Sequence, residues 1–316
     1  MRILVTGADG FVGRHAIKDL ADNGHEISTF DLAYKSRIEQ ATNCFTGDLR
    51  NADSILKAVE TANPDACLHL GGISFEPSGK DDPGNMLDVN ITGTINLLDA
   101  FRKSADSARI LVVSTAFVYG KKQTKEPLKE SDPLAPEGSY AVSKAAADLI
   151  AISYSNKFNM HIMTVRPTNH TGPGQSPQFA IASFVDQVKR IANGESKPLL
   201  KVGNLECERY FTDVRDIVRA YRLLLEKGRA GESYNISSDT RMKIGTVLEK
   251  LYELAGINPK TEKDPDKFRP TDKSPALDIS KLKADTGWEP KIEFSQTLQD
   301  MLQPDLFMKN ARYVIT

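Results

Sequence analysis

Two side chains near the middle of the chain are spaced so that they could do acid–base chemistry together. Tyr140 and Lys144 are four residues apart in the stretch 139–145, SYAVSKA, which is predicted to begin a helix. At that spacing both side chains lie on one helical face. An ammonium group beside a phenol favours the phenolate, so we expect Lys144 to lower the pKa of Tyr140. Such a pair can donate and accept a proton near neutral pH without a histidine.

A hydroxyl group is expected close to this pair. The predicted strand 110–113 ends in Ser114 and Thr115. Ligands of open α/β sheets bind outside the carboxyl ends of the strands, so a hydroxyl there would complete a proton-transfer site. Capping of the strand end is the alternative for these two hydroxyls, and it is the better interpretation when they are taken alone.

The start of the chain predicts the elements that bind a dinucleotide. A β-branched, apolar strand at 2–6 leads into a turn with Gly7, Gly10 and Gly13, and an amphipathic helix follows. In this arrangement the first glycine permits a tight turn, the second lets the backbone approach a pyrophosphate, and the third lets helix and strand pack closely. The helix N-terminus supplies free N–H groups for the phosphates.

Two acidic residues at strand ends bear on the choice of cofactor. Asp31 closes the predicted strand 26–30, where a carboxylate accepts hydrogen bonds from the adenosine ribose and repels a 2′-phosphate. This favours NAD(H), although the basic stretch 35–37 would suit a 2′-phosphate and keeps NADP(H) as the alternative. Asp48 is placed to bond the adenine amino group. Its other interpretation is an N-cap of the helix that starts at Ala52.

Strands and helices alternate through the first half of the chain, which predicts a parallel, doubly wound sheet. The expected fold class is α/β, with a Rossmann-like sheet and a smaller mixed α/β substrate domain at the C-terminus. We expect the domains at 1–166 and 167–316, with part of 208–237 packing back on the first. Long helices are expected at 83–103 and 139–157.

Composition excludes several classes of partner. The net charge of −1 gives no electrostatic footprint for nucleic acid or for an anionic membrane. The chain begins with a strand in place of a signal peptide, and no apolar run approaches membrane length. The three cysteines are far apart and lack metal-ligand spacing, so we expect reduced thiols in a cytoplasmic protein that holds no metal.

Taken together, these motifs span nearly the whole chain in a consistent order. They closely resemble those of the extended short-chain dehydrogenase/reductases that act on nucleotide sugars. The motifs that carry the resemblance are Gly7-x-x-Gly10-x-x-Gly13, Asp31, Asp48-Leu49, Leu70-Gly71-Gly72, Asn90, Ser114-Thr115, Val118-Tyr119-Gly120 and Tyr140-x-x-x-Lys144.

The resemblance implies a role for each reactive side chain. Thr115 is expected to hold the substrate oxygen, Tyr140 to exchange a proton with it, and Lys144 to bind the nicotinamide ribose and lower the phenol pKa. Nicotinamide exchanges hydride with the sugar carbon, so the protein supplies positioning and a proton. The expected cofactor-binding residues are Gly7, Gly10, Phe11, Val12, Asp31, Asp48, Leu49, Leu70, Gly71, Gly72, Asn90, Val113, Tyr140, Lys144 and Arg166.

The second half of the chain supplies the residues expected to bind the substrate. By resemblance, Asn169, Arg209 and Arg269 contact the substrate diphosphate, and an arginine suits this role as a planar fork. Judged without that context, either arginine would be assigned to the solvated surface. The expected substrate-binding residues are Ser74, Glu76, Thr115, Phe117, Asn169, Gln178, Lys201, Asn204, Arg209 and Arg269.

Two stretches narrow the substrate class. Gly-Asn-Leu at 203–205, together with the stretch 169–175, is similar to enzymes of GDP-sugar metabolism, namely GDP-mannose 4,6-dehydratase and the GDP-rhamnose-forming GDP-4-keto-6-deoxy-mannose reductases. The sugar 4,6-dehydratases carry acidic residues just after the catalytic threonine. Here Ala116 and Phe117 occupy those places and cannot transfer a proton.

The sequence therefore predicts an NAD(P)H-dependent reductase of a nucleotide-activated 4-keto-6-deoxy sugar. An NAD-retaining 4-epimerase is the alternative, and a dehydratase or a nicotinamide-sensing protein without catalysis is less favoured. Ala116 and Phe117 leave the exact sugar open, including other deoxy sugars and heptoses. By resemblance we also expect a homodimer in which the two long helices pair into a four-helix bundle, through Leu87, Ile91, Ile95, Leu98, Ala145, Leu149 and Ile152. Burial of these side chains inside one monomer is the alternative.

Overall fold

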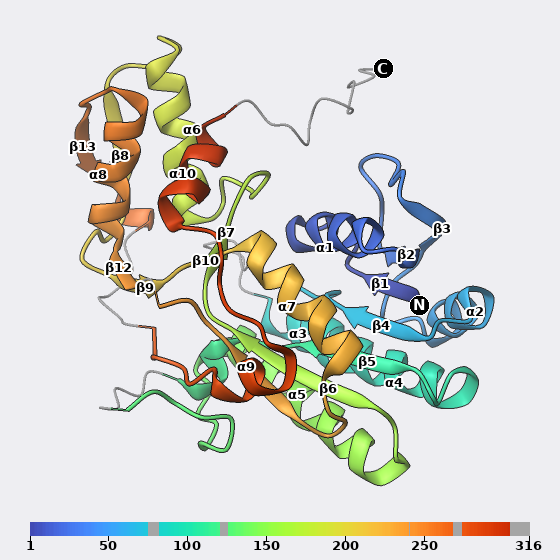
Figure 1. Ribbon diagram of the computed structural model, residues 1–316. Helices are drawn as coiled ribbons and strands as arrows, with labels where there is room; N and C mark the ends of the chain where they lie inside the picture. Colours follow the sequence, from blue (N-terminus) through green and yellow to red (C-terminus); the bar gives the residue numbers. More distant parts are fainter. Residues whose placement is uncertain (75–81, 121–125, 240, 268–273, 304–316) are drawn as a thin grey trace. The chain divides into compact units, whose positions relative to one another are not determined.

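Seven strands form one sheet, which the computed structural model shows in Figure 1. They are β1 (Arg2–Thr6), β2 (Glu26–Asp31), β3 (Ala41–Thr46), β4 (Ala66–His69), β5 (Arg109–Val113), β6 (Ile162–Pro167) and β11 (Ser233–Ile236). Their order is β11-β6-β5-β4-β1-β2-β3, and every adjacent pair is parallel. The predicted Rossmann-like, doubly wound sheet is confirmed.

The structure describes residues 1–74, 82–120, 126–239, 241–267 and 274–303. The chain divides into two units. Unit 1 comprises Met1–Thr168, Ile217–Ser237 and Pro275–Glu289, and unit 2 comprises Asn169–Asp216, Ser238–Ser274 and the chain from Pro290 onward. The sequence carried no expectation that 275–289 returns to the first unit.

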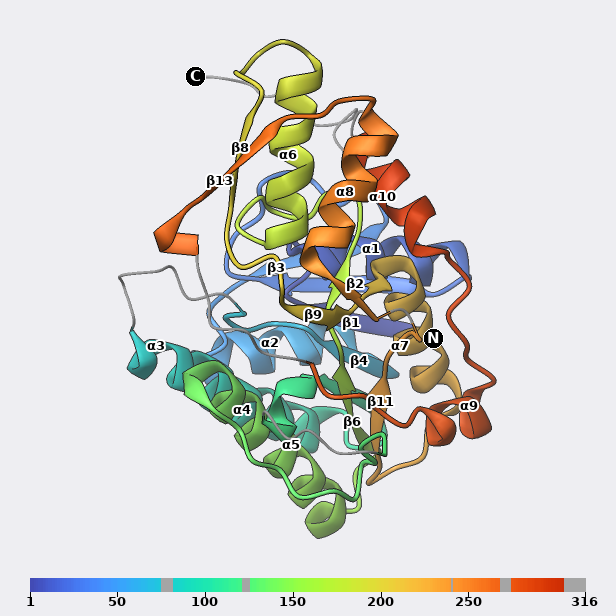
Figure 2. The same ribbon diagram turned by 90° about the vertical axis from the view of Figure 1, so that its left-hand side faces the viewer.

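Helices cover both faces of the sheet in unit 1 because its strands are apolar on both sides. Figures 1 and 2 show α4 and α5 on one face and α1 and α7 on the other. One core cluster joins side chains of α2, α4 and α5 to those of β1, β4 and β5. The helices of unit 1 are α1 (Phe11–Asp22), α2 (Ala52–Ala62), α3 (Pro83–Leu87), α4 (Gly93–Ser104), α5 (Gly138–Phe158), α7 (Val214–Lys227, shared at its first turn with unit 2) and α9 (Ser280–Thr286).

The helix predicted at 83–103 contains one irregular turn. A π-helical turn at Asp88–Thr92 separates α3 from α4. Asn90 lies in this turn, and its carbonyl accepts a hydrogen bond from the Thr94 hydroxyl at 2.7 Å. Such turns widen a helix locally and occur frequently at functional sites.

Unit 2 is a smaller mixed α/β assembly. Its strands form three two-stranded pairs: β7 (His170–Thr171) with β10 (Thr212–Asp213), β8 (Leu199–Val202) with β13 (Lys260–Lys263), and β9 (Glu208–Tyr210) with β12 (Arg241–Lys243). Its helices are α6 (Ala180–Ala192), α8 (Ile244–Ala255) and α10 (Phe294–Leu302), with a short 3₁₀ turn at Pro265–Lys267. The three helices bury a second core of their own.

The face expected to pair in a dimer is only partly exposed. Leu149 is 60% exposed and Val142 is 41% exposed on α5. Leu98 and Ala145, which were expected on that face, are buried in the core of the monomer. Within the part of the chain that the structure describes, no helix is long and apolar enough to cross a membrane.

Candidate active site

Helix α5 carries Tyr140 and Lys144 in its first two turns. Gly138 begins the helix in a left-handed conformation (φ +79°) after Glu137 as N-cap. The Ser143 hydroxyl donates to the Tyr140 carbonyl at 2.8 Å within this first turn. The Lys144 ammonium donates to the Val113 carbonyl at the end of β5, at 3.0 Å. The lysine therefore joins the helix to the carboxyl edge of the sheet.

Burial dominates the electrostatics of both side chains. It raises the pKa of Tyr140 to about 12, and a hydrogen bond with the Thr115 side chain acts in the opposite direction. Burial also lowers the pKa of Lys144 to about 8. The prediction that the phenol pKa lies below its usual value is wrong, because desolvation of the phenolate outweighs the favourable contacts. A phenol with this pKa stays protonated near neutral pH, which suits a proton donor.

A short 3₁₀ turn, η2 (Ala116–Tyr119), places Thr115 beside Tyr140. Thr115 is the N-cap of the turn, and its hydroxyl accepts from the Phe117 N–H at 3.3 Å. Thr115 is buried, whereas Phe117 is 37% exposed. The neighbouring Ser114 donates to the Lys144 carbonyl at 3.2 Å, so this hydroxyl anchors the helix, and Thr115 is the one that meets the phenol.

Asn90 links the π-helical turn to Ile73, after β4, and to Ser143 on α5. Its amide oxygen accepts from the Ile73 N–H at 2.7 Å, and its amide nitrogen donates to the Ile73 carbonyl and to Ser143 Oγ. A Cβ on Gly72 would come within 2.6 Å of that amide oxygen and 3.6 Å of Lys144 Nζ. Gly72, Asn90 and Lys144 are thus brought together as the sequence predicted, although the Asn90 side chain is occupied by protein contacts.

The sequence prediction missed a buried histidine behind this site. His69 Nδ1 lies 2.7 Å from Thr6 Oγ1 and His69 Nε2 lies 3.1 Å from Thr94 Oγ1. Burial, reinforced by the charge of Lys144, lowers the pKa of His69 to about 3, so the ring is neutral near pH 7. Ser143 was also missed, although its spacing of three residues from Tyr140 places it on the same side of the helix.

The glycine-rich turn forms a cradle of the kind that a dinucleotide requires. Gly7 has φ +68°, and a Cβ there would lie 2.7 Å from the Gly71 amide nitrogen, so the ends of β1 and β4 approach closely. A Cβ on Gly13 would overlap the carbonyls of the same turn. Helix α1 starts after Gly10 with no side-chain cap, which leaves the N–H groups of its first turn to bind an anion. These residues fit a dinucleotide.

Leu49, Leu70 and Gly71 complete this edge as small or apolar surface. The Leu70 N–H donates to the Thr6 carbonyl at 3.2 Å and the Gly71 N–H to the Thr6 hydroxyl at 3.1 Å. Leu49 is buried, and its side chain lies where a Cβ on Gly71 would point. The predicted cofactor residues that follow β1 and β4 therefore lie together at the carboxyl ends of these two adjacent strands.

Asp31 lies among both acidic and basic neighbours at the end of β2. Its carboxylate accepts from the Asp9 N–H at 2.8 Å and from the Leu32 N–H at 2.7 Å. Asp9 is in turn ion-paired with Arg14. The Arg14 guanidinium also donates to Ser36 Oγ at 2.9 Å. Arg14 was not anticipated from the sequence, because its approach to residue 36 depends on the fold.

Asp48 does not cap helix α2. Asn51 is the N-cap, and its side chain accepts from the Ser54 N–H at 3.1 Å. The Asp48 carboxylate instead pairs with Arg50 at 2.6 Å, and this contact lowers the pKa of Asp48. The capping alternative is therefore wrong, and an open hollow lined by Asp48, Arg50, Asn51, Ala52 and Asp53 lies beside the start of the helix.

Arg166 is placed differently from the expected cofactor ligand. Its side chain is 5% exposed, and it forms an ion pair of 2.8 Å with the fully buried carboxylate of Asp148. The remaining donors of the guanidinium also bond protein oxygens. No N–H group of the guanidinium is left for a cofactor, so this side chain does not fit the expected role of a cofactor ligand. The sequence did not reveal this, because the two residues are brought together only by packing of α5 on β6.

The residues expected to bind substrate from the second half lie on separate elements of unit 2. Asn169 precedes β7, and its carbonyl accepts from the Thr212 N–H at 3.0 Å. Arg209 lies in β9 opposite Met242 of β12. Asn204 accepts from the Glu206 N–H in the loop before β9. Lys201 in β8 and Gln178 before α6 are exposed.

Of the three remaining residues expected to bind substrate, the structure describes only Ser74. Ser74 is exposed after β4. Glu76 and Arg269 lie outside the described residues.

Comparisons with known proteins agree with this geometry. A family model described as GDP-mannose 4,6 dehydratase matches residues 4–301. GDP-6-deoxy-D-mannose reductase of Pseudomonas aeruginosa is 33% identical over 303 residues, which cover 95% of this chain and 96% of the relative. The structure of RMD from Pseudomonas aeruginosa complexed with NADPH is 32% identical, with a TM-score of 0.83 over 96% of this chain and 98% of that one.

A second solved structure represents another branch of relatives. UDP-glucose 4-epimerase from Thermus thermophilus, in complex with NAD, is 27% identical with a TM-score of 0.84 over 96% of this chain and 98% of that one. The family model and these relatives each match residues of both units. The chain therefore belongs to the GDP-mannose 4,6-dehydratase family of NAD-dependent epimerases and dehydratases.

Proposed function

We propose that this protein reduces the 4-keto group of a GDP-activated 6-deoxy sugar. The observation that carries the proposal is the hydrogen bond between the half-buried, protonated phenol of Tyr140 and the Thr115 side chain. The two residues after Thr115, Ala116 and Phe117, carry no acidic or basic group. A dehydratase needs such groups to remove a proton at C5 and to protonate the leaving hydroxyl. The similarity to a GDP-6-deoxy-D-mannose reductase supports the choice of sugar.

Each side chain has a defined task in this reduction. Thr115 holds the carbonyl oxygen of the substrate next to Tyr140, and Tyr140 gives its proton to that oxygen as the carbonyl becomes an alcohol. Lys144 donates to the nicotinamide ribose and, as a cation, stabilises the phenolate that the proton leaves behind. The cofactor, when bound, supplies the hydride that forms the new C–H bond at C4.

A 4-epimerase that retains NAD is the second candidate, since a UDP-glucose 4-epimerase solved in complex with NAD shares the fold. The two functions differ in their use of cofactor. A reductase oxidises one reduced nicotinamide for each sugar, whereas an epimerase consumes none.

Nicotinamide absorbance in a mixture of protein, reduced cofactor and GDP-4-keto-6-deoxy-mannose tests the proposal. We expect absorbance to fall by one equivalent per sugar, with NADH or NADPH identified by running each separately. An unchanged absorbance across GDP-, UDP- and dTDP-activated keto sugars would contradict the reductase. NAD that co-purifies with the protein in that case would favour the epimerase.

We further propose that NADH is the preferred cofactor and that NADPH is also accepted. The Asp31 carboxylate opposes a 2′-phosphate, whereas Arg14, which pairs with the carboxylate of Asp9, would attract one. Replacing Asp31 by Asn should raise the ratio of kcat/KM for NADPH to that for NADH by about tenfold, because a like charge is removed. Arg14→Met should move the same ratio in the opposite direction. Equal ratios in the wild type and both variants would contradict this assignment.

We also propose a homodimer in which α4 and α5 pair with the same helices of a second copy. The exposure of Leu149 and Val142 on α5 supports this arrangement. Sedimentation equilibrium should give twice the 34.8 kDa mass of the chain. The variant Leu149→Asp should sediment as a monomer, and a monomeric wild type would rule the dimer out.

A further inference from the structure

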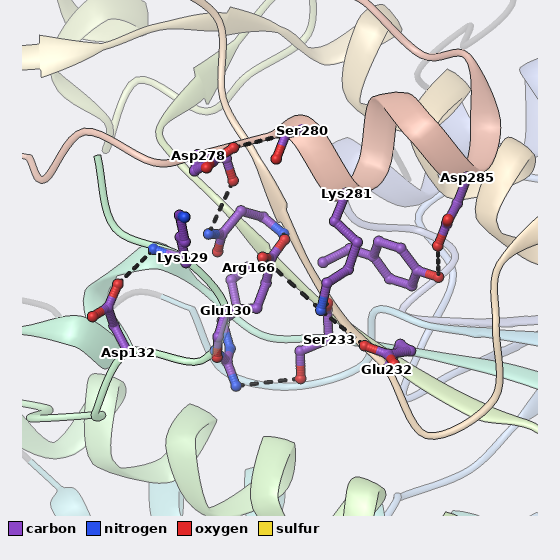
Figure 3. A network of polar contacts seen from close by, with 12 residues as sticks. Lys129, Glu130, Asp132, Arg166, Glu232, Ser233, Asp278, Ser280, Lys281 and Asp285 are labelled. Atoms are coloured by element: carbon purple, nitrogen blue, oxygen red, sulfur yellow. Dashed lines mark hydrogen bonds and ion pairs between the residues drawn. The ribbon is translucent and has the colours of Figure 1, made fainter. Parts of the chain in front are cut away.

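Arg166 on β6 uses its whole guanidinium in contacts with the protein. Nε donates to Asp148 Oδ2 at 2.8 Å and Nη2 donates to Asp148 Oδ1 at 3.1 Å, which is a bidentate pair. Nη1 donates to the Tyr119 hydroxyl at 2.9 Å and to the Glu130 carbonyl at 3.0 Å. Nη2 also reaches Ser233 Oγ at 3.3 Å, a contact drawn in Figure 3.

Two of these partners, Asp148 and Tyr119, belong to the segments that carry Tyr140 and Thr115. Asp148 lies on α5, one helical turn beyond Lys144 and two beyond Tyr140. Tyr119 ends the 3₁₀ turn that begins after Thr115. One guanidinium therefore holds both the helix of the proton donor and the turn of the hydroxyl that meets it.

Tyr119 has a second anchor that restricts it further. Its hydroxyl donates to Asn235 Oδ1 at 2.8 Å while it accepts from Arg166. The Asn235 amide nitrogen donates to the carbonyls of Leu128 and Asp278, at 2.9 and 3.2 Å. Tyr119 and Asn235 are both completely buried. The position of the Tyr119 ring is thus fixed from two directions.

The surrounding contacts extend this anchoring to Glu130, which precedes α5 in the chain. Glu130 follows the turn, and its carboxylate accepts from the Asn235 N–H at 2.9 Å. Lys281 of α9 lies 4.0 Å from that carboxylate and donates to Glu232 at 2.8 Å. Figure 3 shows Lys281 reaching from its helix toward Glu232 and Ser233. Arg166 of β6, Glu130, the stretch 232–235 and Lys281 of α9 therefore form one network of polar contacts within unit 1.

A buried ion pair is a poor source of stability, since its desolvation cost offsets most of the attraction. Apolar side chains in place of Arg166 and Asp148 would hold β6 and α5 together as well. They would not donate a hydrogen bond to the Tyr119 hydroxyl, as Arg166 does. The arrangement is better explained by geometry. We propose that Arg166 is a positioning residue, which sets the separation of Thr115 and Tyr140 by binding Tyr119 and Asp148 at the same time. This inference rests on the proposed function for the roles of Thr115 and Tyr140.

Two variants test the proposal with different severity. Tyr119→Phe removes only the hydroxyl between Arg166 and Asn235, and Arg166→Lys keeps the charge but loses the fork. Each should lower kcat by about 10- to 100-fold, because small displacements of reacting groups have effects of that size. The dissociation constant of the reduced cofactor should change less than about twofold in both. A variant with general loss of structure would weaken cofactor binding as well.

Arg109 provides the matched control. It lies at the start of β5, at the opposite end of the strand from Thr115, and its guanidinium donates to the carbonyls of Leu225 and Gly228. Arg109→Lys should lower the stability of the fold but leave kcat within about twofold of the wild type. Wild-type kcat in folded Tyr119→Phe and Arg166→Lys would overturn the proposal.

Crystal structures of the wild type and Tyr119→Phe give a second readout that needs no activity. We expect the distance between Thr115 Oγ1 and Tyr140 Oη to increase in the variant. An unchanged distance would overturn the positioning role, whatever the reaction. A wild-type protein that reduces no keto sugar would overturn the proposed function, and the crystallographic distance would still decide this inference.

Discussion

Replacing Tyr140 by Phe is expected to lower kcat by about 10²- to 10⁴-fold, the range that a positioned proton donor contributes. The change removes one hydroxyl and retains the ring, so the packing of α5 is kept. Three described neighbours cannot take over this role, since Ala116 and Phe117 carry no ionisable group and the His69 ring is buried and neutral. Cofactor binding should remain within about threefold of the wild type, as measured by fluorescence titration with the reduced nicotinamide.

Tyr154→Phe is the matched control for this variant. Tyr154 lies on the same helix, and its hydroxyl donates to Asp99 Oδ1 at 3.4 Å. We expect its kcat to equal that of the wild type. Full turnover by Tyr140→Phe would refute the assignment of Tyr140 as proton donor, whatever the substrate.

Replacing Lys144 by Met should have the second largest effect on turnover, a loss of about 10²- to 10³-fold in kcat. That is the range for removing one preorganised donor from a site that stabilises developing charge. In the proposed reduction, Lys144 positions the nicotinamide ribose and faces the phenolate. Unlike Tyr140→Phe, this variant should also bind the reduced cofactor more weakly.

The same substitution should stabilise the fold in a way that depends on pH. Burial lowers the folded-state pKa of Lys144 to about 8, below the usual value of 10.5 for a lysine. Below pH 8 the wild type keeps a buried ammonium, which costs on the order of 3 kcal/mol relative to the neutral form. Between pH 8 and 10.5 the unfolded chain binds more protons, so wild-type stability rises with pH through this window.

Urea unfolding at several pH values measures this difference. The free energy of unfolding of Lys144→Met should exceed that of the wild type at pH 7, and the gap should narrow between pH 8 and pH 10. The exposed Lys103→Met should show a constant difference over the same range. A gap for Lys144→Met that does not vary with pH would show that its ammonium is not buried.

Much of the fold and the main residues of the candidate site could be predicted from local patterns. Tyr140 and Lys144 were identified by their spacing on a helix, and Gly7 and Gly13 by their position between a strand and a helix. These patterns could be interpreted from the sequence because each depends on residues that are close together in the chain. The contact of Thr115 with Tyr140 agrees with the prediction of a hydroxyl at the end of a strand, close to the helix of Tyr140. The close approach of Gly7 to Gly71 was not predicted.

What the sequence could not predict depends on contacts between distant residues. Arg166 was assigned to the cofactor, because nothing in its neighbourhood along the chain indicates that Asp148 accepts its fork. The raised pKa of Tyr140 follows from burial, which a linear pattern of residues does not measure. The approach of Arg14 to Ser36 likewise requires the helix after β1 and the loop after β2 to be in place.

Transfer of deuterium tests the central claim most directly. The protein is mixed with GDP-4-keto-6-deoxy-mannose and reduced cofactor that carries deuterium at the transferred position, and the sugar product is analysed by NMR. We predict one deuterium at C4 and none at C5, with Tyr140→Phe forming the labelled product about 10²- to 10⁴-fold more slowly. A product without deuterium at C4, or exchange of the C5 proton with solvent, would contradict a 4-keto reductase.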